Sequence, residues 1–351
     1  MLSKFAVNLL DPSRPWRPSQ KLVPNLFDKK NDVTHYRNLQ LCKKHGLVIV
    51  KIHRILSFTQ SAWLKPWIDL CNEQHRNAQS DFESDLAKLH SNATFGKICE
   101  QVRNRVNVRL ISDETKMLKA VAKVSFRRSQ IINEDLVLVQ SARTKLKLNK
   151  PLAVGFAILE ISKFLTFSFY YDHLKAKYGN KCSLLFRDTD SFCCELETDD
   201  LYAALGRDLH LYDTSNFDPK HPQYLTANKR VLEKVKSETG STPPEEFVGL
   251  RAKMYSLHIP GTPAKCFKKL RGFKKNYVRK RMHHEQFLKV LKYVGSTTNS
   301  TFRAFRSINH VLNTVEISKL CMCAFDDKRY ILDDGIHTLA YGHYKARASA
   351  R

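Results

Sequence analysis

The chain has 351 residues, enough for two or three packed subdomains, because single cores stop growing near roughly 250–300 residues. Its 59 lysines and arginines against 34 acids give a formal net charge of +25, which favours a nucleic acid or an anionic membrane as partner without deciding between them. A ribosomal or chromatin-type binder, or a chain charged for solubility, shares this composition. No uninterrupted apolar run approaches the roughly 20 residues that span a bilayer, and the first 21 residues lack the apolar core of a signal peptide. We therefore expect no membrane partner.

Nine cysteines give an odd number without any C-x-x-C pair. A zinc ribbon or finger needs such closely spaced ligand pairs. Cys321 and Cys323 lie two apart, but no matching pair accompanies them. The sequence predicts reduced, mostly buried thiols in an intracellular protein, in the nucleus or the cytoplasm.

The first half of the chain begins irregularly and then becomes helical. Four prolines interrupt the first 24 residues, and a short strand is predicted at 46–52. From about 65 to 109, apolar residues recur at helical spacing. The block 100–150 holds 12 lysines and arginines against 5 acids, and it contains strand-like stretches at 106–111 and 136–139.

The second half begins with the longest apolar helical run, from Pro151 to Gly179, with proline and glycine at the ends where helices favour them. Two apolar strands, 183–186 and 192–196, then flank a short acidic tip, which predicts a β-hairpin. Further strands are predicted at 247–250 and 254–257. The segment 264–293 has 11 lysines and arginines and one acid, and we expect helix after it and a loop-rich end.

The acidic tip carries the sharpest chemistry. In an extended backbone Asp188 and Asp190 point to the same side, because side chains repeat every two residues. Two neighbouring carboxylates favour a hard cation, and Mg²⁺ takes one or two carboxylates together with phosphate oxygens. Taken alone, the same four residues are more typical of a surface turn.

Three further patterns suit a nucleotide or nucleic acid. On a helix, Lys88, Asn92 and Phe95 share one face, although a solvated amphipathic helix gives the same spacing. On a strand, Lys253 and Tyr255 share one side, as they also do on any half-exposed strand. The basic segment 264–293 is interleaved with aromatic residues, which suits a nucleic-acid backbone better than solubility alone.

These patterns occur in an order that resembles family B DNA polymerases. Lys88-Leu-His-Ser-Asn92-Ala-Thr-Phe95-Gly96 is similar to the fingers motif K-x-x-x-N-x-x-F-G of that family. Phe186-Arg-Asp-Thr-Asp-Ser resembles its palm hairpin, which usually has Tyr in place of Phe186. Lys253-Met-Tyr resembles the K-x-Y strand that grips primer DNA.

The intervening text resembles the protein-primed branch found in Polinton or Maverick mobile elements. The likeness covers most of the chain from about residue 21. The stretches that carry it are Lys21-Leu-Val-Pro-Asn-Leu-Phe-Asp-Lys-Lys, His35-Tyr-Arg-Asn-Leu, Ser61-Ala-Trp-Leu-Lys-Pro-Trp, Glu246-Phe-Val-Gly-Leu-Arg and Phe325-Asp-Asp-Lys-Arg-Tyr.

The resemblance implies a role for each matching residue. Asp190 would be the direct ligand of a catalytic pair of Mg²⁺ ions, and Asp188 a supporting acid. Residues that contact or shape the incoming nucleotide would be Arg76, Lys88, Asn92 and Phe95. Residues that contact DNA would be Gly96, which lets the template approach, Lys253 and Tyr255, which hold the primer, and Lys274 and Lys275 in the thumb.

The fold that the resemblance implies is α+β, a right-hand polymerase fold with an antiparallel-sheet palm, helical fingers and a small basic thumb. We expect a connector region at 1–64, fingers and a basic region at 65–150, a palm at 151–262 and a thumb with a tail at 263–351. The implied activity is DNA-directed DNA synthesis in replication. Its partners are a DNA primer-template, dNTP and a terminal priming protein.

One departure from the family changes the expectation for this chain. The other metal aspartate of the family lies in a D-x-x-S-L-Y-P motif, and Asp11-Pro-Ser-Arg-Pro is the nearest text here. An exonuclease domain is also missing, and the Arg187 cation would compete for the metal carboxylates. Two-metal phosphoryl transfer needs carboxylates on both sides of the metal pair, so we expect the isolated chain to be nearly inactive.

Two rival interpretations follow. In the first, the chain is a catalytically dead remnant that keeps only DNA binding. Such a remnant would be a fragment or a decayed copy of a mobile-element polymerase. A nuclease with a carboxylate metal site would draw on Glu195 and Glu197, but it leaves the fingers motif unexplained.

Overall fold

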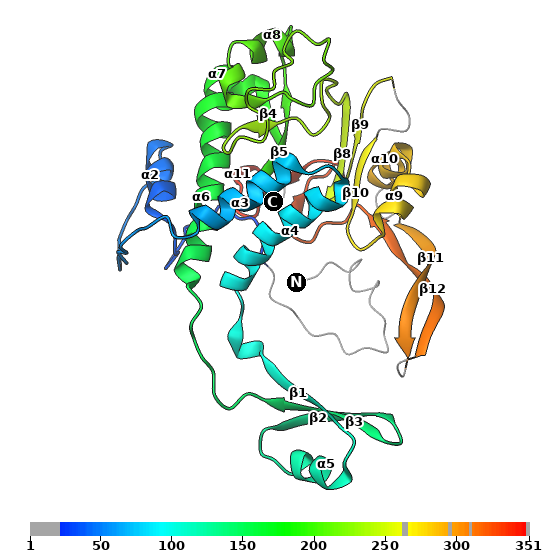
Figure 1. Cartoon of the computed structure of the whole chain (residues 1–351). Helices are drawn as coiled ribbons and strands as arrows, with labels where there is room; N and C mark the ends of the chain where they lie inside the picture. The colour runs from blue at the N-terminus through cyan, green and yellow to red at the C-terminus, as the bar shows by residue number, and fades with distance from the viewer. Residues whose placement is uncertain (1–21, 262–265, 294–296, 309–310, 349–351) are drawn as a thin grey trace. The chain divides into compact units, whose positions relative to one another are not determined.

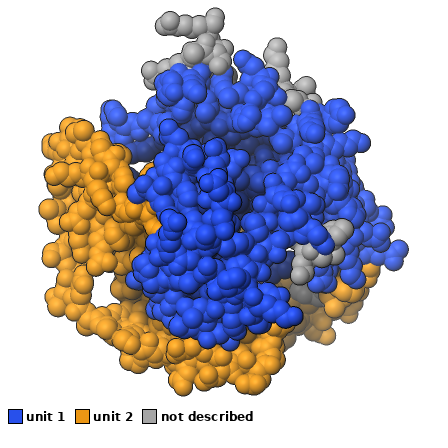
Figure 2. Space-filling model, turned by 90° about the horizontal axis from the view of Figure 1, so that it is seen from above, with its two compact units in different colours: residues 1–32, 174–304, 315–351 blue, residues 33–173, 305–314 orange. Residues whose placement is uncertain are grey.

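Helices and antiparallel strands alternate along the chain in the computed structural model, which describes residues 22–261, 266–293, 297–308 and 311–348 (Figure 1). The protein is therefore a mixed α and β structure with antiparallel sheets, and the α+β class is confirmed. The chain divides into two compact units, coloured separately in Figure 2. One unit comprises 1–32, 174–304 and 315–351, and the other comprises 33–173 and 305–314.

The unit formed mainly by 33–173, called here the helical unit, contains a pair of packed helices where the sequence predicts helix. Pro66 in the first turn starts the first of them, and Ser80 caps the second by accepting a hydrogen bond from the backbone N–H of Glu83. Trp67 Nε1 donates to Thr94 Oγ1 at 2.9 Å, which ties the two helices together. The elements before the sheet are α2 (Tyr36–Lys44), α3 (Lys65–Asn77), α4 (Asp81–Ile98) and the 3-10 turn η1 (Val102–Asn104).

A small sheet with one helix follows in the same unit. Its strand order is β1-β3-β2, all antiparallel, and Val139 on the central strand is buried at 1% exposure. Both strands predicted here are confirmed. The elements are β1 (Val106–Ile111), α5 (Glu114–Val121), β2 (Phe126–Asn133) and β3 (Leu136–Ala142). We refer to residues 106–142 as the sheet–helix module.

The long apolar helix is confirmed with its predicted ends. It comprises α6 (Leu152–Ser168), a π-helical turn (Phe169–Lys175) and α7 (Ala176–Tyr178), and it stops at Gly179, whose φ of +55° suits glycine. Within the described residues, the segment Leu152–Lys181 is the one helical stretch long and apolar enough to cross a membrane, by length and composition only. The search for uninterrupted apolar runs in the sequence missed this segment, because polar residues interrupt it.

A buried carboxylate on α6 anchors the segment before α2. Glu160 is 4% exposed and accepts hydrogen bonds from Thr34 Oγ1 at 2.9 Å, from the backbone N–H of His35 at 3.1 Å and from Asn38 Nδ2 at 2.9 Å. Lys163 adds an ion pair from the same helix. Burial opposes ionisation of Glu160, but these donors outweigh it and lower its pKa to about 2.

The other unit, called here the hairpin unit, is built from antiparallel hairpins. The predicted acidic hairpin and the two predicted strands at 247–250 and 254–257 are confirmed. Its elements up to residue 258 are η3 (Gly179–Lys181), β4 (Cys182–Asp188), β5 (Ser191–Leu196), α8 (Leu201–Gly206), η4 (Leu209–Leu211), β6 (Tyr212–Asp213), β7 (Val235–Lys236), β8 (Glu246–Arg251) and β9 (Met254–His258). The short pair β6–β7 is parallel.

The remaining elements give this unit its main core. Phe287 and Met322 are fully buried among apolar residues of two helices and of the sheet that β8 and β9 form with the strand at Phe267–Leu270. His284 is buried beside them, with Nδ1 at 2.8 Å from Ser256 Oγ and Nε2 at 3.2 Å from Glu246. The elements are β10 (Phe267–Leu270), α9 (Lys275–Arg281), α10 (His284–Lys292), β11 (Thr297–Ile308), β12 (Val311–Cys323), β13 (Tyr330–Ile331), β14 (Thr338–Leu339) and α11 (Tyr344–Ala348). Of these, the part of β11 from Phe305 and the part of β12 up to Thr314 are grouped with the helical unit.

Two local predictions are wrong. No strand forms at 46–52: residues 47–62 have no regular structure, and Val48 and Val50 are 84% and 92% exposed. A strand needs a hydrogen-bonded neighbour, and none of the described residues supplies one. The helix expected after 293 is instead the hairpin β11–β12, whose exposure alternates along 311–320 with the period of a strand.

The cysteines are all free, as the sequence predicts, but fewer are buried than expected. Cys71, Cys182, Cys321 and Cys323 are buried, whereas Cys99 is exposed and the rest are half-buried. The half-buried ones are Cys42 on α2, Cys193 and Cys194 on β5, and Cys266 just before β10.

Candidate functional site

The acidic tip of the β4–β5 hairpin is a tight two-residue turn. Asp188 pairs with Ser191, which leaves Thr189 and Asp190 as the turn itself. Thr189 has a φ of +61°, an unfavourable conformation for a β-branched residue that costs on the order of 1–3 kcal/mol. Its carbonyl accepts a hydrogen bond from Arg187 Nη2 at 2.9 Å. Asp190 therefore lies in the turn, and the extended backbone assumed for 188–190 is wrong.

A second hairpin reaches this tip. The β8–β9 turn consists of Ala252 and Lys253, because Arg251 pairs with Met254. Lys253 has a φ of +60°, so it lies in the turn before β9, and the prediction that it shares a strand with Tyr255 is wrong. From this turn Lys253 Nζ lies 2.9 Å from Asp188 Oδ2.

The ion pair itself adds little stability. The side chains of Lys253 and Asp188 are 57% and 36% exposed. Exposed pairs of this kind contribute about 0–1 kcal/mol, because water screens the charges. The contact therefore indicates where the two turns meet more than what holds them together.

Aromatic packing beneath the tip joins the same two hairpins. The rings of Phe186 and Tyr255 lie 4.3 Å apart between centroids, and Phe247 stacks on Phe186 at 5.7 Å. Such pairs contribute roughly 0.5–1.5 kcal/mol beyond their burial. A Cβ on Gly249 would lie 2.7 Å from the Phe247 ring, so glycine leaves room for that ring. The charged tip is thus fixed to an aromatic cluster in which Tyr255 is buried and the two phenylalanines are half-buried.

The cluster also changes the chemistry of Tyr255. This side chain is buried at 8% exposure. Burial, followed by the nearby charges of Asp188, Cys193 and Glu238, raises its pKa to about 12. The Tyr255 hydroxyl therefore stays protonated, and available as a hydrogen-bond donor, even at alkaline pH values where a free tyrosine would ionise.

Each carboxylate of the tip has a cation beside it. Asp188 contacts Lys253, and Arg187 is close enough to Asp190 for their charges to attract. Burial lowers the pKa of Arg187, and the charge of Asp190 opposes that effect. The tip is consequently a place where carboxylates and cations are mixed, as the sequence predicts for Arg187.

The donor set suits a hard cation in part. Asp188 and Asp190 supply two carboxylates, and Mg²⁺ often takes one or two carboxylates with water and phosphate. Across the part of the chain that the structure describes, no cluster of three or more His, Cys, Asp or Glu residues could hold a metal ion. Any Mg²⁺ at the tip would draw its other ligands from outside this pair.

The nucleotide-binding candidates of the helical unit lie on α4 and α3. Lys88, Asn92 and Phe95 occur at i, i+4 and i+7 of one unbroken helix, so they share a face as predicted. Lys88 and Asn92 line a cavity of about 130 Å³ between the two helices, together with His75 of α3. Such a cavity is below the roughly 300 Å³ at which ligand pockets begin, so it would hold only part of a nucleotide.

Two further candidates in this unit remain exposed. Arg76 lies in the last turn of α3, because the chain breaks at Ala78 and bends back into α4. Gly96 on α4 is exposed, and a Cβ built there would meet no described atom within 4 Å. Packing within the described residues does not require glycine at that position.

The basic segment rests on the main core of the hairpin unit. Lys274 precedes α9 and Lys275 begins it, and Lys274 Nζ donates to the carbonyl of Arg303 at 3.3 Å. Three cations follow in the last turn of α9, while Val278 on the same helix is buried. The cations of α9 are therefore carried by a helix that packs against the main core of the hairpin unit.

Sequence reasoning missed Phe247 and His75. Phe247 was recognised only as part of a strand. Its spacing of two residues from Gly249 puts both on one side of that strand, where the glycine leaves room for the ring, and this was the available signal. His75 lies beside Arg76, but only the fold of the helix pair brings it to Lys88.

The acidic tip with Lys253 belongs to the hairpin unit, and the Lys88 group belongs to the helical unit. Each group is therefore described by itself. No protein-family model, no curated protein and no solved structure matches this chain.

Proposed function

We propose that the chain is a DNA-directed DNA polymerase of family B, of the protein-primed type found in Polinton or Maverick elements. In this proposal the fold is a right hand. The β4–β5 hairpin belongs to the palm, α3 and α4 form the fingers, and the basic segment from 264 onward belongs to the thumb. The substrates are a DNA primer-template and dNTP, and a terminal protein is the primer.

The observation that carries the proposal is the meeting of two hairpins. The D-T-D-S turn and the K-x-Y segment are more than 60 residues apart in sequence, and neither motif requires the other. Yet Lys253 contacts Asp188 at 2.9 Å, and Tyr255 packs on Phe186 at 4.3 Å. In a polymerase palm, the residues that hold the primer end must lie beside the carboxylates that hold the metal ions, as the K-x-Y segment lies beside the acidic hairpin here.

Each residue then has a defined task. Asp190, with Asp188 beside it, would hold Mg²⁺, which when bound lowers the pKa of the primer 3′-hydroxyl and neutralises charge on the transferring phosphate. Lys253 places a cation beside the carboxylates, where a primer phosphate would lie. The protonated hydroxyl of Tyr255 would donate a hydrogen bond to the primer strand.

A second candidate function is a DNA-binding remnant without turnover. The specific observation in its favour is that Lys253 and Arg187 already place cations at both carboxylates. The printed sequence also holds no D-x-x-S-L-Y-P motif to supply a further carboxylate. On this interpretation the basic segment still binds DNA, and the tip is a structural ion-pair cluster.

The test is primer extension with Mg²⁺, with Asp190→Asn as the variant and Asp199→Asn as its control. Asp199 is an exposed aspartate just beyond β5, so the control removes the same charge outside the tip. A salt-titrated DNA-binding assay runs in parallel. Because the sequence holds no second metal-aspartate motif, we expect only weak extension by the wild type, which Asp190→Asn should abolish and Asp199→Asn should leave unchanged.

Three outcomes separate the candidates. Extension that survives Asp190→Asn would exclude this tip as the catalytic site. No extension by the wild type, with DNA binding that weakens steeply in salt, would identify the remnant. No extension and no DNA binding would refute both.

A further inference from the structure

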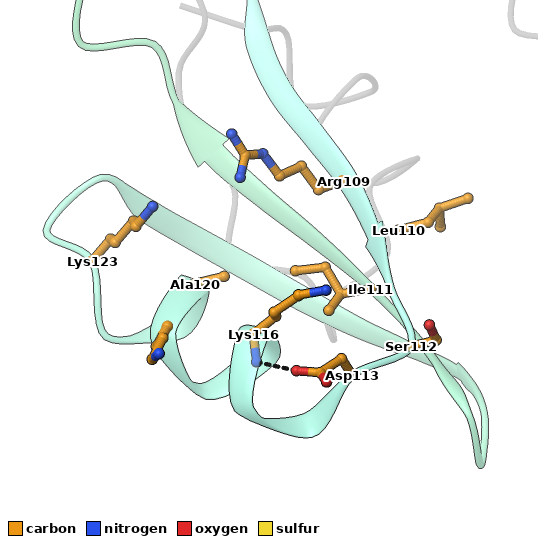
Figure 3. Close-up of a pocket in the computed structure, with 9 residues that line it drawn as sticks. Arg109, Leu110, Ile111, Ser112, Asp113, Lys116, Ala120 and Lys123 are labelled. Atoms are coloured by element: carbon orange, nitrogen blue, oxygen red, sulfur yellow. Dashed lines mark hydrogen bonds between the residues drawn. The ribbon is translucent and has the colours of Figure 1, made fainter.

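An open cavity of about 530 Å³ lies in the sheet–helix module, and none of the residues assigned above lines it (Figure 3). It is formed between the β1 strand and the helix α5. Its floor includes Ile111 and the buried Ala120. Its volume falls within the range of roughly 300–1,000 Å³ that small-molecule sites occupy.

Four cations line this cavity, against a single acid. Figure 3 shows Arg109 on the strand side and Lys116 and Lys123 on the helix side, and Lys119 completes the set. Lys116 and Lys119 lie at i and i+3 on α5, which places them on neighbouring parts of one helix face, and Lys123 follows in the turn after the helix.

The one acid in the lining is already engaged. Asp113 is the N-cap of α5, and its Oδ1 accepts a hydrogen bond from the backbone N–H of Lys116 at 2.7 Å. The carboxylate therefore satisfies the helix end rather than the lysine side chains. Through all the described residues, no ion pair involves any of the four lining cations.

Three other cations of the same unit, by contrast, have a carboxylate partner. Glu100 accepts from Arg105 at 2.6 Å, from Lys97 at 2.9 Å and, more distantly, from Lys150 at 3.5 Å. Those basic side chains share a carboxylate outside the cavity. The four lining cations thus share no carboxylate of this kind, and like charges held together around one opening lower the cost of bringing in an anion.

We propose that this cavity binds linked phosphate groups. Four cations around one opening match a ligand with several negative charges close together better than a single carboxylate or sulfate. Two sources carry that chemistry, the polyphosphate of a free nucleotide and the backbone of a nucleic-acid strand. The inference does not rest on the proposed polymerase activity, since it uses none of the residues assigned to that site.

The experiment uses the full chain and two charge-matched variants. Lys116→Gln with Lys119→Gln removes two lining cations. Lys145→Gln with Lys147→Gln removes two exposed cations from the loop after β3 and serves as the control. Far-UV circular dichroism melts check that both variants fold, and Arg109→Gln on the opposite wall is a second variant that leaves α5 intact.

Two probes distinguish the sources. Inorganic tripolyphosphate is titrated by calorimetry, and a fluorescent oligo-dT is titrated by anisotropy at several salt concentrations. We expect the lining variant to weaken tripolyphosphate binding at least about tenfold more than the control. For a strand source, the lining variant would instead lower the salt slope of oligonucleotide binding by about two.

Loss confined to the oligonucleotide assigns the cavity to a nucleic-acid backbone, and loss with tripolyphosphate assigns it to free polyphosphate as well. Equal effects of the lining and control variants on both probes would overturn the proposal, because the binding would then reflect net charge. Absence of binding to either probe would also overturn it.

Discussion

The carboxylate of Glu160 gives a prediction whose size follows from the structure. Its side chain is 5% exposed and holds the segment before α2 through donors from Thr34, His35 and Asn38. Lowering the pKa from 4.5 to about 2 corresponds to roughly 3 kcal/mol of stability. Because Lys163 is half-exposed, the realised value should lie nearer 2 kcal/mol.

The sign of the pH dependence follows from the direction of this shift. A carboxyl whose pKa is lowered by folding stabilises the native state above its unfolded pKa. That contribution is fully present above about pH 4.5 and is lost as the pH falls toward 2. Acid should therefore release the segment before α2 from α6.

The assay is urea denaturation of the wild type and of Glu160→Gln at pH 7, 4 and 2.5. We expect the variant to be less stable at pH 7 by about 2 kcal/mol, and the difference to shrink toward pH 2.5. Glu73→Gln, an exposed change on α3, is the control and should have almost no effect. A difference that stays constant across this pH range would refute the reasoning.

Three further predictions follow from single contacts. A Cβ on Gly155 would lie 2.2 Å from Cys99 Sγ, so Gly155→Ala should lower the unfolding free energy by about 1–3 kcal/mol; adding Cys99→Ala should restore much of it in a thermal melt, and no rescue would contradict the contact. Ser256→Ala leaves buried His284 without its 2.8 Å partner and should cost about 1–3 kcal/mol in urea denaturation, whereas a neutral effect would show that the hydrogen bond is dispensable. Burial raises the pKa of Cys193 to about 11, so its alkylation at pH 8 should be much slower than that of exposed Cys99, as peptide mass spectrometry can measure; equal rates would contradict the burial.

The local elements were predictable where pattern and punctuation agree. The acidic hairpin combines two apolar runs with a short polar tip, and its strands fall within a residue or two of the expected ends. The long helix is bounded by Pro151 and Gly179 as predicted. In both, the deciding interactions lie between residues close in sequence.

The failures share a different cause. Residues 47–52 have the composition of a strand, but a strand also needs a neighbour, and sequence does not reveal whether one is present. Lys253 was assigned to a strand because its neighbours belong to one, whereas the pairing of Arg251 with Met254 fixes it in the turn. Pairing register is a property of two segments, so one segment does not determine it.

The candidate site was predictable as a set of residues and not as an arrangement. The motif text named Asp188, Asp190, Lys253 and Tyr255 individually. The ring of Phe247, which completes the aromatic cluster beneath them, contributes through packing between hairpins. The cavity of the sheet–helix module was equally hard to predict, since Arg109, Lys116, Lys119 and Lys123 converge only after the strand and the helix pack.

The irregular stretch 47–62 has a consequence for the colloidal behaviour of the protein. Its valines, isoleucines and leucines face water, and such surfaces attract one another. At low ionic strength a net charge of +25 keeps the molecules apart, whereas at about 0.1 M salt the repulsion reaches only about 10 Å. Concentrated stocks should therefore be clearest at low salt and should become turbid as salt is added, the reverse of the usual behaviour of a basic protein mixed with nucleic acid.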